Sequence, residues 1–410
     1  MSNIRQWLEQ TKRRGMKLGL ERVHAAHKSL IQSYDATIIH VAGSNGKGTA
    51  CALMATHLNR LNKTTVMFTS PHLVHLEERI RIDGRPISEQ QFDIYLSQIQ
   101  QTELDSGIEL TFFEVTFLAS CLCVRDLNPD VFIVETGLGG RFDATRILPA
   151  DLCLLTSIQL EHRDILGDTL AEIAAEKAAI ARPQKPMFVR DIEDTEARSA
   201  VENEAHNAGQ EPLGEIPSPA NVEWITIDSK SSMKEEALML VKVALSHLNF
   251  KMDSIDESMQ SLNWPGRMQH IEPMSWGGSL FVDAAHNPSG LKRVLPSITE
   301  RVASKMEWCL VFGCTPQDDL DAFVQPLLDL CKKHPPSNIL LTTPQTGRYP
   351  GVSFSELRRL DWSCEQAIIH APTPYEAKLS LEHLQPEFTL AIGSLYLIGE
   401  LFEALDINLQ

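Results

Sequence analysis

The sequence of 410 residues lacks long apolar runs and has few cysteines. No stretch approaches the roughly 20 apolar residues that span a bilayer, so we expect no contact with a membrane. The N-terminus, MSNIRQWLEQTKRRG, lacks the apolar segment of a secretory signal, which favours a cytoplasmic protein. The closest of the eight cysteines, Cys121 and Cys123, lack the spacing of metal ligands. We therefore interpret the cysteines as buried free thiols in a reducing compartment.

The chain also lacks an excess of positive charge. It has 37 Lys and Arg against 54 Asp and Glu, which gives a formal net charge of −17. A phosphate backbone needs a basic surface to displace counterions, so this charge argues against a general nucleic-acid-binding protein. It does not exclude a local basic pocket for small anions. Internal repeats and low-complexity segments are not evident.

The residues that are present indicate a soluble α/β protein with two domains. The length exceeds the usual size of one core, and 43% apolar with 22% charged residues is typical of globular proteins. Near-continuous apolar runs alternate with helical patterns, which predicts mostly parallel sheets covered on both faces. The expected strands are 37–42, 65–69, 130–135, 152–157 and 186–189, followed by 279–283, 308–313, 338–342 and 388–393.

Helical patterns are expected at 48–61, 168–182 and 232–248, whereas the Pro/Gly-rich stretch 205–222 is expected to be a surface connection. We place the domain boundary near residue 272, which gives domains 1–272 and 273–410. The first is expected to be a parallel-sheet domain of the P-loop type and the second a Rossmann-like α/β domain.

The stretch GSNGKGT (43–49) lies between an expected strand and an expected helix. Its glycines let backbone N–H groups converge on an anion, and the helix N-terminus adds partial positive charge. Lys47 supplies an ammonium for phosphates, and Thr49 a hydroxyl for Mg²⁺ or phosphate. We therefore predict a nucleoside triphosphate site. The spacing is shorter than in the standard P-loop, which would need Gly at Val41, so an ordinary Gly-rich turn is the alternative interpretation.

Polar side chains follow three further expected strands: Ser70, Glu135 and His162. Ligands of open α/β sheets bind at the carboxyl ends of the strands, so these side chains are candidates for one divalent cation. Each alone also has an ordinary interpretation, as a cap, a surface carboxylate or a loop residue.

Further along the chain, Lys177 lies on a helical stretch and could be a solvated lysine. Asp283 and His286 end the first strand of the second domain, where Asn287-Pro288 suits the start of a helix. Arg267 lies near the domain junction and could reach a phosphate.

Blocks along most of the chain resemble the folylpolyglutamate synthase / dihydrofolate synthase family of the Mur ligase superfamily. They occur in the family's order. The blocks are LGLERV (18–23), HVAGSNGKGT (40–49), FTSPHLVHLEERIRIDG (68–84), LTFFEVT (110–116), VETGLGGRFDAT (134–145), TSIQLEHRDILGDTLAEIAAEKAAI (156–180), WPGRMQ (264–269), VDAAHNP (282–288) and GSLYLIGEL (393–401).

The resemblance implies a role for each candidate residue. The phosphates of ATP would be bound by Gly43, Ser44, Asn45, Gly46, Lys47, Gly48 and Thr49, and the nucleotide also by Arg267 and Asp283. Magnesium would be bound by Ser70, Glu135 and His162, and a carbamylated Lys177 would support a second magnesium ion. His286 would lie near the transferred phosphate and the incoming amino acid, and Thr111, Phe113 and Asp143 would line the pterin pocket.

The implied activity is ATP-dependent ligation of L-glutamate to dihydropteroate, folates or both through an acyl phosphate, by a protein expected to be a monomer. Two alternatives stay open: a related ligase for a different acid or amino acid, and a nucleotide-binding protein that has lost ligation. Glu236 stands where the family usually has an Asn that contacts adenine, and VFGCTPQDDL (311–320) lacks the family's Lys-Asp pair. The Glu236 departure puts nucleotide affinity or base selectivity in question, because a carboxylate can only accept hydrogen bonds from adenine.

Overall fold

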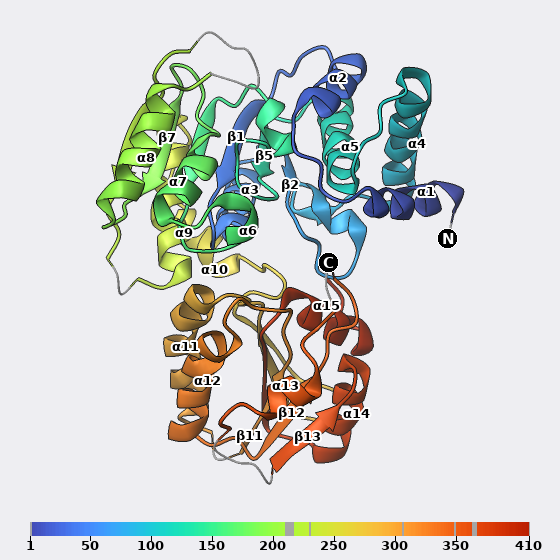
Figure 1. Ribbon diagram of the computed structural model, residues 1–410, viewed down its shortest axis with the longest axis vertical. Helices are drawn as coiled ribbons and strands as arrows, with labels where there is room; N and C mark the ends of the chain where they lie inside the picture. The colour runs from blue at the N-terminus through green and yellow to red at the C-terminus, as the bar shows by residue number, and fades with distance from the viewer. Residues whose placement is uncertain are drawn as a thin grey trace. The chain divides into compact units, whose positions relative to one another are not determined.

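The structure is a computed structural model that describes residues 2–209, 217–228, 231–305, 307–347, 350–362 and 367–409. The chain forms two compact units, Met1–Leu262 and Asn263–Gln410 (Figure 1). The division falls before the expected residue 272, because β9 (Gln269–Ile271) pairs antiparallel with β10 (Ser279–Asp283) in the second unit. The segment just before 272 therefore packs with the second unit.

The first unit is built on an eight-stranded sheet in the order β4-β3-β2-β5-β1-β6-β7-β8. The six strands from β2 to β8 in this order are parallel, and β3 and β4 form an antiparallel edge. The strands are β1 (Thr37–Ala42), β2 (Thr65–Phe68), β3 (Ile80–Ile82), β4 (Arg85–Pro86), β5 (Val131–Glu135), β6 (Leu152–Leu155), β7 (Pro186–Arg190) and β8 (Asn221–Ile225).

Helices cover both faces of this sheet, which explains why its central strands are apolar throughout. The helices are α1 (Asn3–Thr11), α2 (Glu21–Leu30), α3 (Lys47–Arg60), α4 (Glu89–Ser106), α5 (Phe112–Leu127), α6 (Arg163–Leu166), α7 (Leu170–Ala178), α8 (Thr195–His206), α9 (Met233–His247) and α10 (Ile255–Ser261). Short 3-10 helices in the described residues of this unit are η1 (Lys12–Arg14), η2 (Leu76–Arg79) and η3 (Ala144–Ile147). Ile38 and Phe132 share one core with residues of α5 and α7, and alternate strand residues such as Ile39 point to the opposite face.

The second unit is a six-stranded sheet in the order β13-β12-β11-β14-β10-β9, parallel except for β9. Its remaining strands are β11 (Trp308–Phe312), β12 (Asn338–Thr342), β13 (Ile368–Ala371) and β14 (Phe388–Ile392). Its helices are α11 (Pro288–Val302), α12 (Leu320–Lys333), α13 (Phe354–Arg358), α14 (Pro374–Leu384) and α15 (Leu395–Ala404).

The predicted fold class, two α/β units on mostly parallel sheets, is confirmed. Within the connection expected at 205–222, α8 continues to His206 and β8 begins at Asn221, and residues 210–216 lie outside the described part of the chain. The predicted strands and helices are present, but β3, β4, β8, β9 and β13 were not predicted.

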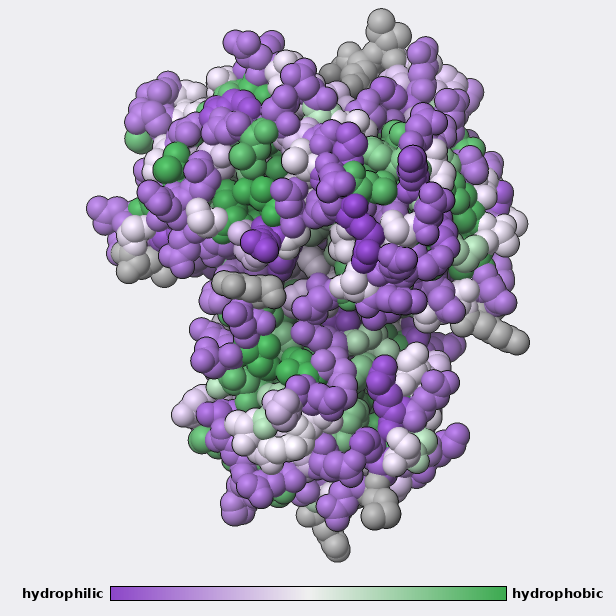
Figure 2. Space-filling model, turned by 180° about the vertical axis from the view of Figure 1, so that it is seen from behind, coloured by the Kyte–Doolittle hydropathy of each residue, from purple (hydrophilic) through white to green (hydrophobic). Residues whose placement is uncertain are grey.

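Side chains are distributed as the composition indicates. On the face in Figure 2 hydrophilic residues predominate, and apolar residues form scattered patches. Seven cysteines are free and buried, and Cys364 lies outside the described residues. Within the described residues, every helix is too short or too polar to cross a membrane.

Candidate active site

The predicted phosphate loop connects β1 to α3, and its backbone has room only for glycine at the first position. Gly43 has φ +143°, and a Cβ there would lie 2.0 Å from the hydroxyl oxygen of Thr156. Gly46 is the N-cap of α3 and has the left-handed φ of +89°. Lys47 is the first residue of the helix. The loop therefore brings bare backbone to the N-terminus of a 14-residue helix, which suits an anion.

This loop is fastened to the segment that follows β6. The backbone N–H of Ser44 donates to the carbonyl of Ser157 at 2.7 Å, and that of Asn45 donates to the Ser157 hydroxyl at 3.0 Å. The Thr156 hydroxyl donates to the carbonyl of Asn45 at 2.8 Å. These hydrogen bonds hold the loop against the segment that follows β6.

Two of the predicted metal ligands lie together beside this loop. Glu135 ends β5 and is buried, and its Oε2 accepts a hydrogen bond from the backbone N–H of Ser70 at 3.2 Å. Lys47 Nζ donates to the carbonyl of Gly43 at 2.8 Å and lies 3.9 Å from Glu135 Oε1. A carboxylate and a hydroxyl are the oxygen ligands that Mg²⁺ takes in proteins, so these two residues fit that ion.

The third predicted ligand, His162, is exposed and is the N-cap of the short helix α6, with φ +46°. Ser70 follows β2 and Glu135 ends β5, whereas His162 lies seven residues after the end of β6. Clusters of three or more His, Cys, Asp or Glu with metal-binding geometry are also absent from the part of the chain that the structure describes. The fit of His162 to a metal therefore stays a prediction.

Lys177 is not a solvated lysine, because it is only 2% exposed. Its Nζ lies 2.7 Å from Glu161 Oε1 and donates to the carbonyl of Gly43 at 3.3 Å. Burial lowers the pKa of Lys177, although Glu161 opposes this effect. Burial alone would raise the pKa of Glu161, but the ammonium groups of Lys177 and Lys47 lower it to about 2. Glu161 is thus a charged member of the site that the sequence interpretation missed.

The predicted pterin residues surround the start of α5 and the loop after β5. The Thr111 hydroxyl accepts from the backbone N–H of Glu114 at 3.3 Å and caps the helix. The Phe113 ring lies 5.7 Å from that of Phe68, and a Cβ on Gly137 would lie 2.6 Å from it. Close packing here therefore requires glycine at the start of the GLGG loop.

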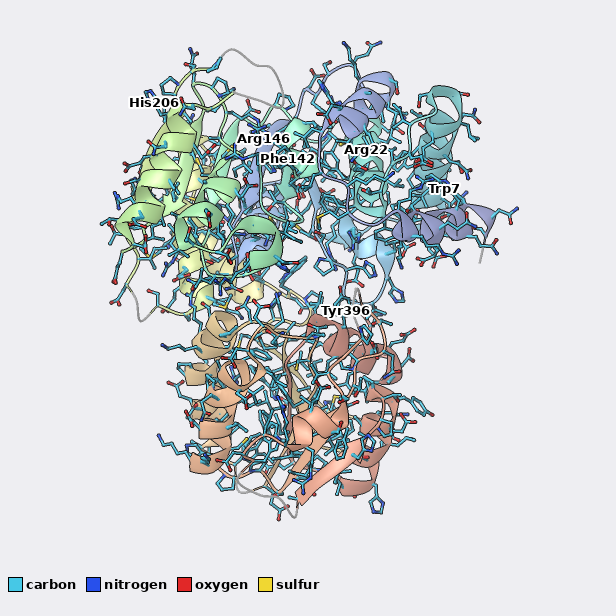
Figure 3. All side chains as sticks on the ribbon, in the orientation of Figure 1. Trp7, Arg22, Phe142, Arg146, His206 and Tyr396 are labelled. Carbon is cyan, nitrogen blue, oxygen red and sulfur yellow. The ribbon has the colours of Figure 1, made fainter. Side chains whose placement is uncertain are left out.

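Asp143 is buried, and its carboxylate holds the same loop from within. It accepts from the backbone N–H groups of Gly137 at 2.8 Å and Leu138 at 2.9 Å, and from both the N–H and the hydroxyl of Thr145. Burial raises the pKa of Asp143, and these hydrogen bonds oppose that effect. Its neighbour Phe142, labelled in Figure 3, is 41% exposed. Substrate contact by Asp143 remains a prediction, whereas its support of the loop is direct.

In the second unit, the predicted residues lie at the carboxyl end of β10. Asp283 is buried and accepts from the backbone N–H groups of Met268 at 2.9 Å and Ala285 at 2.8 Å. Burial raises its pKa, and the Arg267 guanidinium opposes this. His286 Nδ1 lies 3.0 Å from the carbonyl of Ala284, so Nδ1 carries the proton that is donated there.

Asn287 caps α11, and Pro288 opens that helix as predicted.

Glu236 is buried and forms an ion pair with the half-buried Arg190. It lies in the first turn of α9, and its Oε1 is 2.7 Å from Nη2 and 2.9 Å from Nε of Arg190, which ends β7. The sequence analysis did not predict that Arg190, 46 residues away, is the partner of Glu236.

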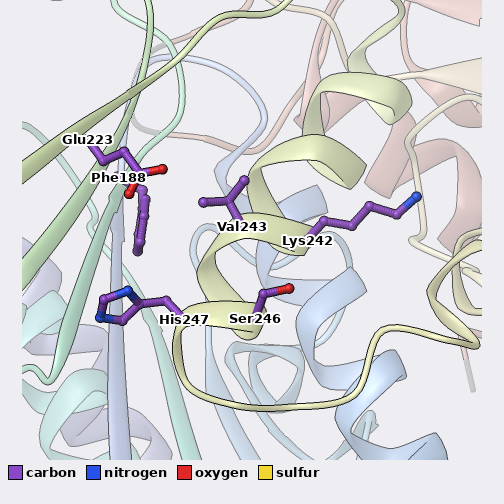
Figure 4. Close-up of a pocket in the computed structure, with 6 residues that line it drawn as sticks. All are labelled: Phe188, Glu223, Lys242, Val243, Ser246 and His247. Atoms are coloured by element: carbon purple, nitrogen blue, oxygen red, sulfur yellow. The ribbon is translucent and has the colours of Figure 1, made fainter.

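A cavity of about 430 Å³ lies elsewhere on the first unit, where β7 and β8 meet α9 (Figure 4). Its lining contains none of the predicted site residues and consists of Phe188, Glu223, Lys242, Val243, Ser246 and His247.

The chain is similar in sequence to known proteins. No protein-family model matches the chain. It is 32% identical to the Escherichia coli dihydrofolate synthase/folylpolyglutamate synthase over 69% of this chain and 68% of that protein. It is 29% identical to the Bacillus subtilis protein of the same name over 74% of this chain and 77% of that protein.

Solved structures show the same fold. E. coli FolC in complex with DHPP and ADP is 25% identical and superimposes with a TM-score of 0.79 over 99% of this chain and 98% of that chain. A Mycobacterium tuberculosis folylpolyglutamate synthase complexed with ADP and AMPPCP is 20% identical, with a TM-score of 0.81 over 99% and 98%. The predicted family is therefore confirmed, and the chain belongs to the dihydrofolate synthase/folylpolyglutamate synthase family.

Proposed function

We propose that the protein uses ATP to ligate L-glutamate to the carboxylate of dihydropteroate and of folates, releasing ADP and phosphate. The observation that carries this proposal is the fixed phosphate loop with Lys47 beside Glu135 and Ser70, all at the carboxyl edge of one sheet. Membership of a family of ATP-dependent ligases supports it.

The chemistry explains why this edge is rich in cations. In the first step a carboxylate oxygen of the acceptor attacks the γ-phosphorus of ATP. The bond from this phosphorus to the β,γ-bridging oxygen breaks, ADP leaves, and an acyl phosphate is formed. In the second step the amine of L-glutamate attacks the acyl carbon, phosphate leaves, and the amine loses a proton. Two anions meet in the first step, so Lys47 and the N–H groups of the loop must stabilise their charge.

Magnesium supplies further positive charge at the phosphates when it is bound. We assign its ligation to Ser70, Glu135 and His162. For a second ion, a carbamate on Lys177 would place a new anion beside Glu161, and a divalent cation would offset the repulsion between them. The amine must lose its proton to be carbamylated, and burial of Lys177 favours the neutral form.

The remaining contacts are assigned by the resemblance. Thr111, Phe113 and Asp143 line the pterin side, where Phe113 offers an aromatic ring close to the strand that ends in Glu135. From the second unit, Arg267 and Asp283 bind nucleotide, and His286 acts near the transferred phosphate. We further propose that the protein is a monomer and acts in the cytoplasm.

A coupled assay tests the function. Purified protein receives ATP, Mg²⁺ and L-glutamate with dihydropteroate, with tetrahydrofolate, or with no acceptor, and ADP and phosphate are measured with the ligated product. We expect product and phosphate with either pteridine acceptor and only in the presence of glutamate. Turnover with a different acid alone contradicts the assigned acceptor, and bound ATP without turnover on any acceptor contradicts ligase activity.

A further inference from the structure

His40 is a polar residue on an apolar face of β1. It is fully buried, and in the sheet it lies between Val134 of β5 and Cys153 of β6. Its side chain points to the same face as Ile38 and Ala42, which belong to the core formed with α5 and α7. Burying a polar group costs free energy unless it is hydrogen-bonded, so the partners of this imidazole indicate its role.

One nitrogen of the His40 ring has a partner. Its Nε2 lies 2.7 Å from the hydroxyl oxygen of Thr145, which follows 105 residues later in the chain. Among the described residues, Nδ1 has no hydrogen-bond partner. Burial lowers the pKa of His40 well below its ordinary value, and the guanidinium groups of Arg182 and Arg146 act in the same direction. The ring is therefore neutral and carries a single proton on one of its two nitrogens.

The Thr145 hydroxyl determines which nitrogen carries this proton. A hydroxyl has one hydrogen, and that of Thr145 is donated to Asp143 Oδ1. The Thr145 oxygen can therefore only accept from His40, which places the imidazole proton on Nε2. With Nδ1 bare, no N–H group of the ring is buried without an acceptor. Two hydrogen bonds thus run in one direction, from His40 through Thr145 to Asp143.

Asp143 extends this chain to the loop after β5. Its Oδ2 accepts from the backbone N–H groups of Gly137 at 2.8 Å and Leu138 at 2.9 Å, and its Oδ1 accepts from the N–H of Thr145 at 3.0 Å. Three backbone N–H groups that point at one carboxylate favour its ionised, accepting form. Gly137 packs so closely on the Phe113 ring that a Cβ there would lie 2.6 Å from it. The position of the loop beside Phe113 therefore depends on the orientation of the Asp143 carboxylate.

We infer that His40 is a positioning residue for the pteridine acceptor. Its Nε2–H holds the Thr145 oxygen, so that the hydroxyl hydrogen stays on Asp143 and the loop after β5 keeps the shape that receives the pteridine. This inference rests on the proposed function, in which Phe113 and Asp143 line the pterin side. It gives β1 two tasks, because the strand supports the acceptor loop through His40 and leads into the phosphate loop at Gly43.

Two amides of different length test the chain. The side-chain N–H of Gln can take the place of His40 Nε2–H, whereas that of Asn reaches only the place of Nδ1. We expect His40→Asn to raise KM for dihydropteroate about tenfold, the effect of one lost hydrogen bond, while KM for ATP changes less than about twofold. His40→Gln should restore most of this loss.

His57→Asn is the matched control for destabilisation. His57 is equally buried in the first unit, but its ring nitrogens lie 3.0 Å from the Ser258 hydroxyl and 2.7 Å from the Lys251 carbonyl. We expect this variant to lose stability in urea unfolding with KM for dihydropteroate unchanged. Equal KM values in His40→Asn and His40→Gln, an equal rise in KM for ATP, or the same rise in His57→Asn overturns the inference.

A double substitution shows whether His40 acts through Thr145. Thr145→Val removes the hydroxyl that joins His40 to Asp143. Adding His40→Asn to this variant should therefore raise KM for dihydropteroate less than about twofold further. Full multiplication of the two single effects overturns the inference.

The position of the proton is measured without turnover. Nitrogen-15 NMR of the wild-type protein at pH 7, with the His40 signals assigned by their loss in His40→Gln, should show a protonated Nε2 and a bare Nδ1. A proton on Nδ1, or on both nitrogens, overturns the inference. Absence of ligation by the wild type with every acceptor instead refutes the proposed function and leaves this measurement unaffected, so the two failures are distinct.

Discussion

Replacing Glu161 by Gln should destabilise the first unit in protein whose Lys177 carries no carbamate, because it removes the partner of the buried Lys177 ammonium. The Glu161 side chain is 11% exposed and that of Lys177 2%, so solvent screens the pair little. The pKa of Glu161 is about 2 against an ordinary 4.5, which corresponds to about 3 kcal/mol in favour of the folded state at neutral pH. Burial of Lys177 opposes folding in both proteins, so this term largely cancels in the comparison.

The pH dependence has a definite sign. Because the pKa of Glu161 is lower in the folded than in the unfolded state, its stabilisation is fully present above about pH 4.5 and is lost as the pH falls toward 2. The Glu161→Gln variant lacks this group. The difference in free energy of unfolding between wild type and variant should therefore be about 3 kcal/mol at pH 7 and shrink steadily below pH 4.5.

Urea unfolding at a series of pH values measures this difference, and amide hydrogen exchange in peptides of α7 assigns it to the first unit. Glu257→Gln is the matched control, since Glu257 is 66% exposed in its pair with Arg60 and should matter by less than about 1 kcal/mol. A difference that stays constant between pH 7 and pH 3, or a variant as stable as the wild type at pH 7, would refute the reasoning.

Four further substitutions test the site. Lys47→Ala should reduce kcat by at least about 100-fold in a protein that still folds, because its ammonium stabilises transferring charge; retained turnover contradicts this role. Gly43→Ala should destabilise by roughly 1–3 kcal/mol and raise KM for ATP, because its Cβ would lie 2.0 Å from the Thr156 hydroxyl oxygen. A stability equal to that of the wild type would show that the loop can move to accommodate the methyl group. Lys177→Ala should lose activity that added short carboxylates partly restore; failure of this rescue argues against a carbamate. Glu236→Asn should destabilise by roughly 1–3 kcal/mol in urea unfolding, because Arg190 loses its ion pair. An unchanged ratio of ATP to GTP turnover would show that Glu236 does not contact the base.

The parallel strands were predictable because a strand that is buried on both faces is apolar along nearly its whole length. TIIHVA (37–42), SLFVD (279–283) and NILLT (338–342) are near-continuous apolar runs, and the structure has strands with the same bounds. The glycine-rich turn between β1 and α3 was predictable for a different reason, since glycine is the residue that its positive φ angles and the contact with Thr156 admit. Phosphate binding by this turn stays a prediction.

The edge strands were missed because they lack that signature. In β8 exposed and half-buried residues alternate up to Ile225, and in β13 only Ala371 is buried. One covered face is enough for an edge strand, so its apolar residues are too few to separate it from a loop. For the same reason the expected connection 205–222 extends over Asn221 and Val222, the first two residues of β8.

The sequence did not reveal two ion pairs, because the residues of each pair lie far apart along the chain. Glu161 and Lys177 are 16 residues apart, and Arg190 and Glu236 are 46 apart, so neither ion pair follows from a local pattern. The position of Glu236 in the chain suggested a changed base contact, whereas the structure shows that its carboxylate neutralises Arg190 at the end of β7. An Asn there would leave that guanidinium without its carboxylate, so the two positions must be judged as a pair. The role of Glu236 could therefore be inferred only once the structure showed that its carboxylate faces the Arg190 guanidinium.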